Sequence, residues 1–368
     1  MNFNNMGLIP PIIKALNEVN YTAPTDIQIQ SIPQILKGRD IIGCAQTGTG
    51  KTAAFVIPLL QRLSSEPAKN KFPRVLILAP TRELAIQITQ NIENFSKYLD
   101  LKHLVIFGGV STQKQIKSLQ SGVDILVATP GRLLDLINQG YVKLQHIETL
   151  VLDEADNMMD MGFIHDLKRI LKHIPSKRLT LFFSATMPPA IRVFANTILN
   201  NPVEININPV VTTAENVNQS VYFIEKKGKT ELLIKILAKD RDIQTLVFIR
   251  TKHAADRLVK QLRKRGFTAD CIHGNKSQNA RQLALESFKI GKSKILVATD
   301  IAARGIDIHK LPQVINYDLP SESETYVHRI GRTGRAGNAG YAFSFCSEEE
   351  KQALKGIQKL IGFQLAIA

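Results

Sequence analysis

Short apolar runs recur along the first half of the chain, with amphipathic segments between them. The runs are VLILA at 75–79, DILVAT at 124–129, TLVLD at 149–153 and LTLFFS at 179–184. Strands that are apolar on both faces are typical of parallel sheets covered by helices on both sides. The intervening segments have helical spacing; one apolar face holds Ile164, Leu167, Leu171 and Ile174, and another holds Ala255, Leu258, Val259 and Leu262. The pattern predicts an α/β fold with right-handed crossovers.

Two of these runs return in the second half of the chain, in the same order. VLILAPTREL at 75–84 resembles TLVFIRTKHA at 245–254, and DILVATPGRLLDL at 124–136 resembles KILVATDIAARGIDI at 294–308. Two matches in order indicate tandem related domains, and 368 residues exceed the size at which one core stops growing. The stretch 203–219 has no helical period and is the best linker candidate. We therefore expect domains at 1–207 and 216–368, joined by a linker at 208–215.

Charge and cysteine usage narrow the class of protein. The chain has 47 Lys and Arg against 32 Asp and Glu, a net charge of +15, which favours a polyanionic partner such as nucleic acid. The three cysteines, Cys44, Cys271 and Cys346, are far apart and lack the spacing of a metal knuckle, which indicates a reducing cytoplasm. The start of the chain, MNFNNMGLIP, lacks the basic region and the following apolar region typical of a signal peptide, and no apolar run approaches the length needed to span a bilayer.

The segment AQTGTGKT at 45–52 has the context of a phosphate-binding loop. It follows the apolar run DIIGC and precedes the helical stretch TAAFVIPLLQRL. Glycines let backbone N–H groups converge on phosphate oxygens, and the N-terminus of the helix adds the positive end of its dipole. We expect Lys51 to reach the β and γ phosphates and Thr52 to bind Mg²⁺, although Ala45 stands where the general pattern has glycine. The alternative is a strand-to-helix turn without a ligand.

Acidic residues in VLDEAD, 151–156, directly follow another buried strand. The carboxyl ends of strands are where open α/β sheets bind ligands. Asp153 can hold Mg²⁺ through water, and Glu154 can orient or deprotonate an attacking water. An acidic cluster there can also simply cap a helix. Together with the phosphate loop, it predicts an NTPase.

Many motifs in order make the chain resemble the DEAD-box RNA helicases, and the bacterial RhlE-type group in particular. They are AQTGTGKT, PTREL (80–84), GG (108–109), TPGR (129–132), DEAD (153–156), SAT (184–186), VFIRT (247–251), ATDIAARGID (298–307) and HRIGRTGR (328–335). The resemblance implies two tandem RecA-like domains, each a mostly parallel sheet flanked by helices. It also implies ATP hydrolysis to ADP and phosphate, coupled to the local separation of short RNA duplexes.

The same resemblance implies an ATP site in which Gln28 of NYTAPTDIQ (20–28) reads adenine through its amide, with Tyr21 stacked on the base. Asn20 replaces the usual glycine of this motif and is the residue that best tolerates a positive φ in its place. The implied nucleotide-binding residues are Phe3, Tyr21, Gln28, Gln46, Thr47, Gly48, Thr49, Gly50, Lys51, Thr52 and Asp307. Mg²⁺ is the expected metal, held by Thr52 and Asp153.

Arginines near the end of the chain complete the implied catalytic set. By resemblance, Arg332 and Arg335 act as arginine fingers on the γ-phosphate beside Lys51, Asp153 and Glu154. A solvated or nucleic-acid-contacting basic loop is the alternative for HRIGRTGR. The residues implied to couple hydrolysis to domain closure are Asp156, Ser184, Thr186 and His328.

The implied RNA contacts use small residues, hydroxyl groups and guanidinium groups, which suit phosphates and 2′-hydroxyls and not base edges. In the first domain they are Pro80, Thr81, Arg82, Gly109, Thr129, Gly131 and Arg132, and in the second Arg250, Thr251, Thr299 and Arg304. Binding is therefore expected to be independent of RNA sequence. Arg82 and Arg132 could instead form structural ion pairs.

Two other functions fit parts of the pattern. One is an ATP-gated RNA clamp or ribonucleoprotein assembly factor whose unwinding is incidental, since its motifs would be the same. The other is a DNA translocase, against which Gln28 and the DEAD tetrapeptide stand. We expect a cytoplasmic monomer that does not bind membranes. Its possible protein partners are those of ribosome assembly or RNA degradation.

Overall fold

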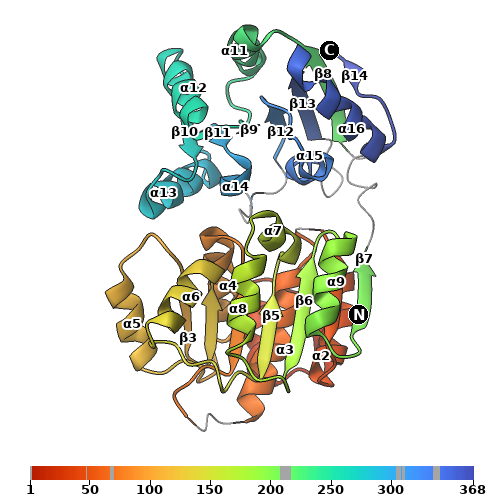
Figure 1. The fold of residues 1–368 in the computed structure, drawn as a ribbon. Coiled ribbons are helices and arrows are strands. Elements are labelled where there is room, and N and C mark those ends of the chain that lie inside the picture. Colours follow the sequence, from red (N-terminus) through yellow and green to blue (C-terminus); the bar gives the residue numbers. More distant parts are fainter. Residues whose placement is uncertain are drawn as a thin grey trace. The chain divides into compact units, whose positions relative to one another are not determined.

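The computed structural model describes residues 2–46, 48–66, 70–207, 217–303, 308, 311–334 and 340–368. The chain divides into two units, Met1–Pro209 and Val210–Ala368, and each unit has its own sheet (Figure 1). Among the described residues, no helix has both the length and the apolar character that a membrane crossing requires.

The sheet of unit 1 has seven strands in the order β3-β4-β2-β5-β6-β1-β7, and every pairing is parallel. The strands are β1 (Ile41–Ala45), β2 (Val75–Leu78), β3 (His103–Ile106), β4 (Ile125–Ala128), β5 (Thr149–Leu152), β6 (Leu179–Ser184) and β7 (Val203–Ile207). Helices cover both faces of the sheet because its strands present apolar side chains to each face.

One face of this sheet packs against η1 (Phe3–Met6), α1 (Pro10–Glu18), α2 (Asp26–Leu36), α3 (Lys51–Ser65) and α4 (Arg82–Phe95). The other face packs against α5 (Thr112–Gln120), α6 (Pro130–Asn138), α7 (Ala155–Asp160), α8 (Ile164–Leu171) and α9 (Pro189–Ile198). The loops at the carboxyl ends of the strands between these layers carry the predicted motifs.

Unit 2 has a second parallel sheet of seven strands, in the order β10-β11-β9-β12-β13-β8-β14. Its strands are β8 (Val217–Phe223), β9 (Thr245–Phe248), β10 (Ala269–Ile272), β11 (Ile295–Ala298), β12 (Gln313–Asn316), β13 (Gly340–Cys346) and β14 (Ala366–Ile367). One face is covered by α11 (Lys229–Lys239) and α12 (Lys252–Lys264). The other is covered by α13 (Gln278–Lys289), α14 (Asp300–Ala303), α15 (Ser323–Ile330) and α16 (Lys351–Ile361), and two short 3₁₀ turns are η2 (Lys226–Gly228) and η3 (Glu348–Glu350).

The repeated sequences occupy equivalent places in the two sheets. β2 and β9, which begin the first pair of similar segments, are each third in their sheet, and β4 and β11 of the second pair are each second. The expected fold class of two tandem RecA-like domains is therefore confirmed.

Two local expectations need correction. The helix that was expected to include Ile174 ends at Leu171, and Ile174 is buried from the turn that follows it. The linker candidate 203–219 is partly regular structure, because its first five residues form β7 beside β1. The narrower linker expected at 208–215 lies outside the described residues.

Candidate active site

The phosphate loop connects β1 to α3, as the sequence predicts, and the helix begins at Lys51. Gly48 and Gly50 have φ values of 83° and 93°, a region that glycine adopts at little cost. Thr49 donates from Oγ1 to the carbonyl oxygen of Gln46 at 2.7 Å. The loop thus folds back on itself before the helix begins; Thr47 lies outside the described residues.

Lys51 is buried, with 5% of its surface exposed, and its Nζ donates to the carbonyl oxygen of Ala45 at 2.6 Å. A buried ammonium group held by a carbonyl is poised to exchange that partner for a phosphate oxygen, which binds it more strongly. Thr52 follows in the first turn of α3. These residues suit a nucleotide phosphate at the helix N-terminus.

Gln28 on α2 is fully buried and supports the phosphate loop directly. Its Nε2 donates to the carbonyl oxygen of Gly50 at 3.0 Å, and its Oε1 accepts from the backbone N–H of Thr25 at 3.0 Å. A Cβ at Gly50 would overlap the Gln28 amide. Nε2 also donates to the Tyr21 hydroxyl at 3.3 Å, so the amide links the residue expected to stack on the base to the phosphate loop.

The aromatic residues expected at the base pack against each other. The ring centroid of Tyr21 lies 5.9 Å from that of Phe3 and 5.6 Å from that of Phe95. Phe3 is 2% exposed and belongs to the core, whereas Tyr21 is half-buried. Asn20, just before it, has a φ of 57°, as expected for a residue that replaces glycine.

Asp153 and Glu154 follow β5 and are both buried, at 2% and 3% exposure. Burial raises the pKa of Asp153 to about 7, against the opposing effect of Lys51. Such a carboxylate gains from a cation beside it, so the donor set fits Mg²⁺. Glu154 has a φ of 51°, an uncommon conformation outside glycine, and its carboxylate accepts from Nδ2 of Asn157 at 2.9 Å. Asn157 is an orienting residue that the motif did not reveal.

Asp156 joins the acidic motif to the SAT segment after β6. Its Oδ2 accepts from the backbone N–H of Ala185 at 3.1 Å and from N and Oγ1 of Thr186 at 2.9 and 3.0 Å. Ser184 Oγ accepts from the Asp156 N–H at 3.3 Å and donates to the Thr186 carbonyl at 2.7 Å. The structure therefore brings three of the four predicted coupling residues into one partly buried network.

The RNA residues predicted in unit 1 follow β2, β3 and β4, at the carboxyl ends of the strands of the sheet that also carries the phosphate loop. Arg82 begins α4 after its N-cap Thr81, and its guanidinium group lies against Gly109, whose φ is 82°. Arg132 on α6 lies 3.6 Å from Asp135 as an ion pair and donates to Gln115 at 3.4 Å.

The remaining members of this set flank the two arginines. Pro80 and Thr129 are buried, and Thr129 is the N-cap of α6. Gly131, in the first turn of α6, is exposed and has no atom within 4 Å of the place where a Cβ would be. Open space of this kind at a helix N-terminus suits a passing phosphate.

In unit 2, Arg250 and Thr251 connect β9 to α12. Thr251 is the exposed N-cap of α12 and accepts from the Ala254 N–H at 3.3 Å. The Arg250 side chain is 61% exposed, yet its Nη2 donates to the Leu319 carbonyl at 3.2 Å and lies 3.5 Å from Glu350. Thr299, after β11, is half-buried. Arg304 lies outside the described residues.

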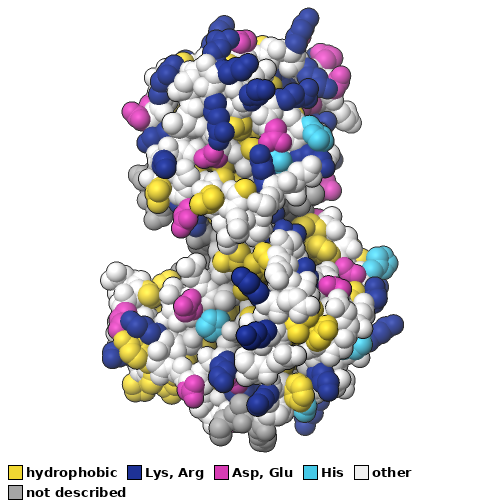
Figure 2. Space-filling view, turned by 90° about the vertical axis from the view of Figure 1, so that its left-hand side faces the viewer, with side chains coloured by type: hydrophobic (Ala, Val, Ile, Leu, Met, Phe, Trp, Pro, Cys, Tyr) yellow, Lys and Arg dark blue, Asp and Glu magenta, His cyan; other side chains and the backbone are white. Residues whose placement is uncertain are grey.

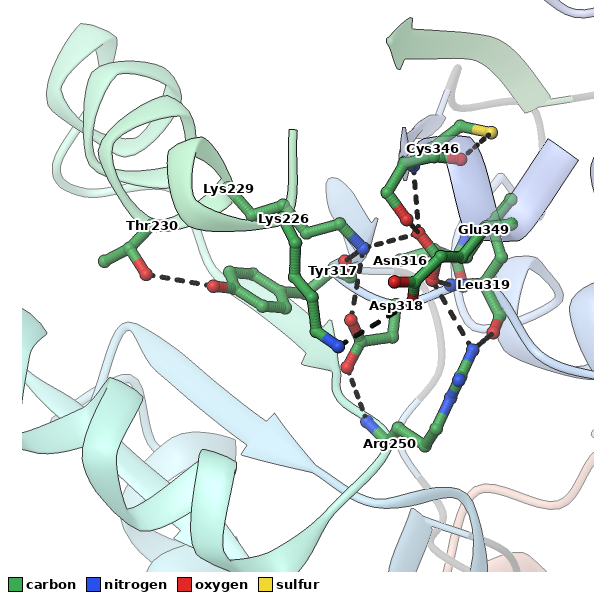
Figure 3. A network of polar contacts seen from close by, with 12 residues as sticks. Lys226, Lys229, Thr230, Arg250, Asn316, Tyr317, Asp318, Leu319, Cys346 and Glu349 are labelled. Carbon is green, nitrogen blue, oxygen red and sulfur yellow. Dashed lines mark hydrogen bonds and ion pairs between the residues drawn. The ribbon is translucent and has the colours of Figure 1, made fainter. Parts of the chain in front are cut away.

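A buried network that the motifs did not predict fixes Arg250 (Figure 3). Lys229 is 1% exposed, and its Nζ lies 2.7 Å from Glu350, 3.1 Å from Asp318 and 2.8 Å from the Tyr317 carbonyl. Asp318 also accepts from the backbone N–H of Arg250 at 2.9 Å. No local signal distinguishes Lys229 from the many surface lysines, because its partners are far away in the sequence.

Arg329 of HRIGRTGR also has a structural role in unit 2. It is 2% exposed and pairs with Asp300 through Nε at 2.6 Å and Nη2 at 2.7 Å, while Nη1 donates to Asn316 at 3.0 Å. This pair ties the ATDIAARGID and HRIGRTGR motifs together. Arg332 is buried at 7% exposure, and His328 lies on α15. Arg335 and Asp307 lie outside the described residues.

Basic side chains are abundant on the surface. Figure 2 shows Lys and Arg side chains spread over the upper part of the view, which is unit 2. In this unit the exposed cations of α12 are Lys252, Arg257, Lys260, Arg263 and Lys264. The excess positive charge suits a polyanion.

Family models match both units. The model of the DEAD/DEAH box helicases matches residues 25–193, and the model of the helicase conserved C-terminal domain matches residues 228–337. Together they include most of the site residues described above.

Among curated proteins, the chain is similar to the ATP-dependent RNA helicase DeaD of Buchnera aphidicola, with 43% identity over all of this chain and 60% of that protein. It is 42% identical to the DEAD-box ATP-dependent RNA helicase CshA of Geobacillus kaustophilus over 97% of this chain and 76% of that protein. DeaD of Escherichia coli is 43% identical, and the match covers 97% of this chain and 56% of that protein. The expected RhlE-type subgroup stays a prediction.

Two solved structures are also similar. Dbp5 of S. cerevisiae bound to RNA and ADP BeF3 is 32% identical, with a TM-score of 0.87 over 100% of this chain and 95% of that chain. A DEAD box protein from Methanococcus jannaschii is 39% identical, with a TM-score of 0.56 over 100% of this chain and 99% of that chain.

Proposed function

The chain belongs to the DEAD-box family of ATP-dependent RNA helicases, and on that premise we propose that it hydrolyses ATP to separate short RNA duplexes locally. The observation that carries the proposal is the network of Asp156, Ser184 and Thr186, which joins the acidic motif beside the phosphate loop to the segment after β6. These bonds form one connected, partly buried set, through which we propose that a change at the nucleotide is transmitted.

ATP is proposed to bind with its phosphates at the loop 46–52, where Lys51 exchanges the Ala45 carbonyl for a phosphate oxygen. Asp153 and Thr52 would hold Mg²⁺, which supplies charge neutralisation on the phosphate oxygens. Glu154, held by Asn157, orients the attacking water and accepts its proton. Arg332 and Arg335 are the proposed arginine fingers, which neutralise the charge that develops on the transferred phosphoryl group.

RNA is proposed to bind both units through its backbone. In unit 1, Arg82 offers a guanidinium group beside Gly109, and Gly131 offers open space at the N-terminus of α6. Thr251 and Arg250 offer a hydroxyl and a cation in unit 2. That Dbp5 has been solved with RNA and a nucleotide analogue supports simultaneous binding of both ligands. Closure of the units on ATP and one RNA strand would bend that strand away from duplex geometry, and hydrolysis would release it.

The test compares wild type with Glu154→Gln in two assays, RNA-stimulated ATP hydrolysis and fluorescence anisotropy of labelled single-stranded RNA. The amide keeps the shape of the carboxylate but cannot accept a proton, so we expect hydrolysis to fall by a factor of about 100 or more. The variant should then hold RNA as long as ATP is present. Rapid release of RNA from Glu154→Gln with ATP would contradict the cycle.

Matched DNA and a duplex substrate separate this function from its alternatives. Stimulation of hydrolysis by RNA and not by DNA of the same sequence is expected, and equal stimulation by DNA would favour a translocase. RNA-stimulated hydrolysis without strand separation would favour an ATP-gated clamp.

A further inference from the structure

We propose that unit 2 contains a zinc site formed by Asp256, Cys271 and His273. Asp256 lies on α12, Cys271 on β10 and His273 directly after that strand, so the site joins a helix to the edge strand it packs against. None of these residues belongs to the ATP or RNA sites proposed above. A carboxylate, a thiolate and an imidazole are the three kinds of side chain that bind Zn²⁺ in proteins.

The three ligand atoms converge on one point. Oδ1 of Asp256 lies 3.1 Å from Nε2 of His273 and 3.4 Å from Sγ of Cys271, and all three ligand atoms lie within 4.8 Å of one another. Zinc bonds of about 2.0–2.3 Å in a tetrahedron place neighbouring ligand atoms roughly 3.3–3.7 Å apart. The two distances to Asp256 are therefore close to those between ligands of one ion.

The contact between His273 and Asp256 lacks the direction of a hydrogen bond. His273 is 1% exposed, and within the part of the chain that the structure describes neither ring nitrogen has a hydrogen-bond partner. Leaving a buried imidazole without hydrogen-bond partners destabilises the fold. A cation between Nε2 and Oδ1 would satisfy both atoms, which gives a reason for this arrangement beyond packing.

A positive charge already lies at this cluster. Nζ of Lys276 is 2.9 Å from Oδ1 of Asp256, and the Lys276 N–H donates to the His273 carbonyl at 3.0 Å, in a turn that brings the lysine back over the cluster. The Lys276 side chain is 35% exposed, so its ammonium group can move into solvent. Zn²⁺ would replace it at Asp256.

Solvent reaches the cluster through a groove. A groove of about 1070 Å³ is lined by residues of α12, β10 and α13, including Asp256, Cys271 and Lys276. Metal entry requires no unfolding of the sheet. Binding forms Zn–S, Zn–N and Zn–O bonds, releases the Cys271 thiol proton to solvent, and leaves the fourth position to water.

The test uses Co²⁺ as a probe of the full chain after treatment with a chelator. Co²⁺ bound to a thiolate gives a sulfur-to-metal absorption band in the near ultraviolet, which is independent of ATP hydrolysis. We expect one such site per chain, and we expect Zn²⁺ to displace Co²⁺ from it. Cys271→Ser should remove the band and weaken binding more than about 100-fold, beyond the loss usual for outer-shell residues. Cys346→Ser, another buried cysteine of unit 2, should keep the band.

Lys276→Ala keeps the test decisive if the cysteine variant folds poorly. Removing the competing ammonium group should tighten Co²⁺ binding by about tenfold, the effect of roughly 1.4 kcal/mol. Absence of the thiolate band in both wild type and Lys276→Ala at excess Co²⁺ would overturn the proposal. So would a band that persists in a folded Cys271→Ser variant.

Discussion

Thr186 donates two hydrogen bonds to one carboxylate oxygen of Asp156, from its backbone nitrogen at 2.9 Å and from Oγ1 at 3.0 Å. The SAT segment after β6 is thereby fixed to the acidic motif after β5. Only the second of these bonds depends on the side chain, so it can be removed while the backbone contact remains.

Thr186→Val is expected to slow RNA strand separation more than ATP hydrolysis. Valine keeps the shape of threonine but removes the Oγ1 donor, and a hydrogen bond to a charged group contributes about 1.5–3 kcal/mol. We expect unwinding to fall by about tenfold or more, with hydrolysis reduced severalfold at most. Parallel assays of both activities check this. Equal losses in the two would mean that Thr186 serves hydrolysis and not its coupling.

Asp153 is expected to make the ATP-free protein less stable as pH rises. Its native pKa of about 7 exceeds the 3.8 of an ordinary aspartate because of burial, so the native state binds more protons than the unfolded state between about pH 4 and 7. The free energy of unfolding therefore falls through this window. The drop in melting temperature between about pH 5 and pH 8 should be smaller in Asp153→Asn than in wild type. Asp166→Asn, on α8, serves as the control.

Gly131→Ala is expected to weaken RNA binding without loss of stability. The position is helical and exposed, and no atom lies within 4 Å of the added Cβ, so the fold accepts alanine. If an RNA phosphate approaches this backbone, the methyl group obstructs it, and affinity should fall about tenfold or more. Anisotropy with labelled RNA measures the affinity, and melting temperature measures the stability.

Gly109→Ala is the contrasting variant at the same edge. There φ is 82° and a Cβ would overlap the Arg82 guanidinium group, so both stability and RNA binding should fall. Unchanged RNA affinity in Gly131→Ala would mean that Gly131 does not contact RNA.

Arg329→Lys is expected to destabilise unit 2 by about 3 kcal/mol. Lysine cannot reproduce the paired bonds of the guanidinium group to Asp300, and breaking a buried ion pair costs several kcal/mol. The matched control is Arg263→Lys, because Arg263 pairs with Asp270 at 59% exposure and should lose less than about 1 kcal/mol. Hydrogen exchange of the β11 and α15 amides reports the local stability. Similar protection in both variants would argue against the structural role of Arg329.

The strand pattern was predictable because burial on both faces leaves a continuous apolar run in the sequence. The runs at 75–79, 149–153 and 179–184 contain β2, β5 and β6. The positive φ at Asn20 was predictable because few residue types tolerate that conformation. The end of α8 was not, because Ile174 is buried from a turn and keeps the helical spacing by coincidence.

Contacts between segments that are far apart in the chain could not be predicted from the sequence. Lys229 contacts Glu350, which is 121 residues away. Cys271 on β10 and His273 just after it lie close to Asp256 on α12. Motif position did assign Asp156, Ser184 and Thr186 to one group, and the structure joins them by hydrogen bonds. Motif position did not show that the Gln28 amide holds Gly50, since the same amide can serve the loop or a base.

The position of β1 in its sheet has a consequence for synthesis on the ribosome. The strand that carries the phosphate loop pairs Ile41 with Leu181 on one side and with Val203 on the other. Its two neighbours thus emerge well over a hundred residues after it, and pairing across such separations is slow. The nascent chain must hold an apolar strand and a glycine-rich loop unpaired through most of the translation of unit 1, and unpaired apolar strands of this kind are prone to aggregate.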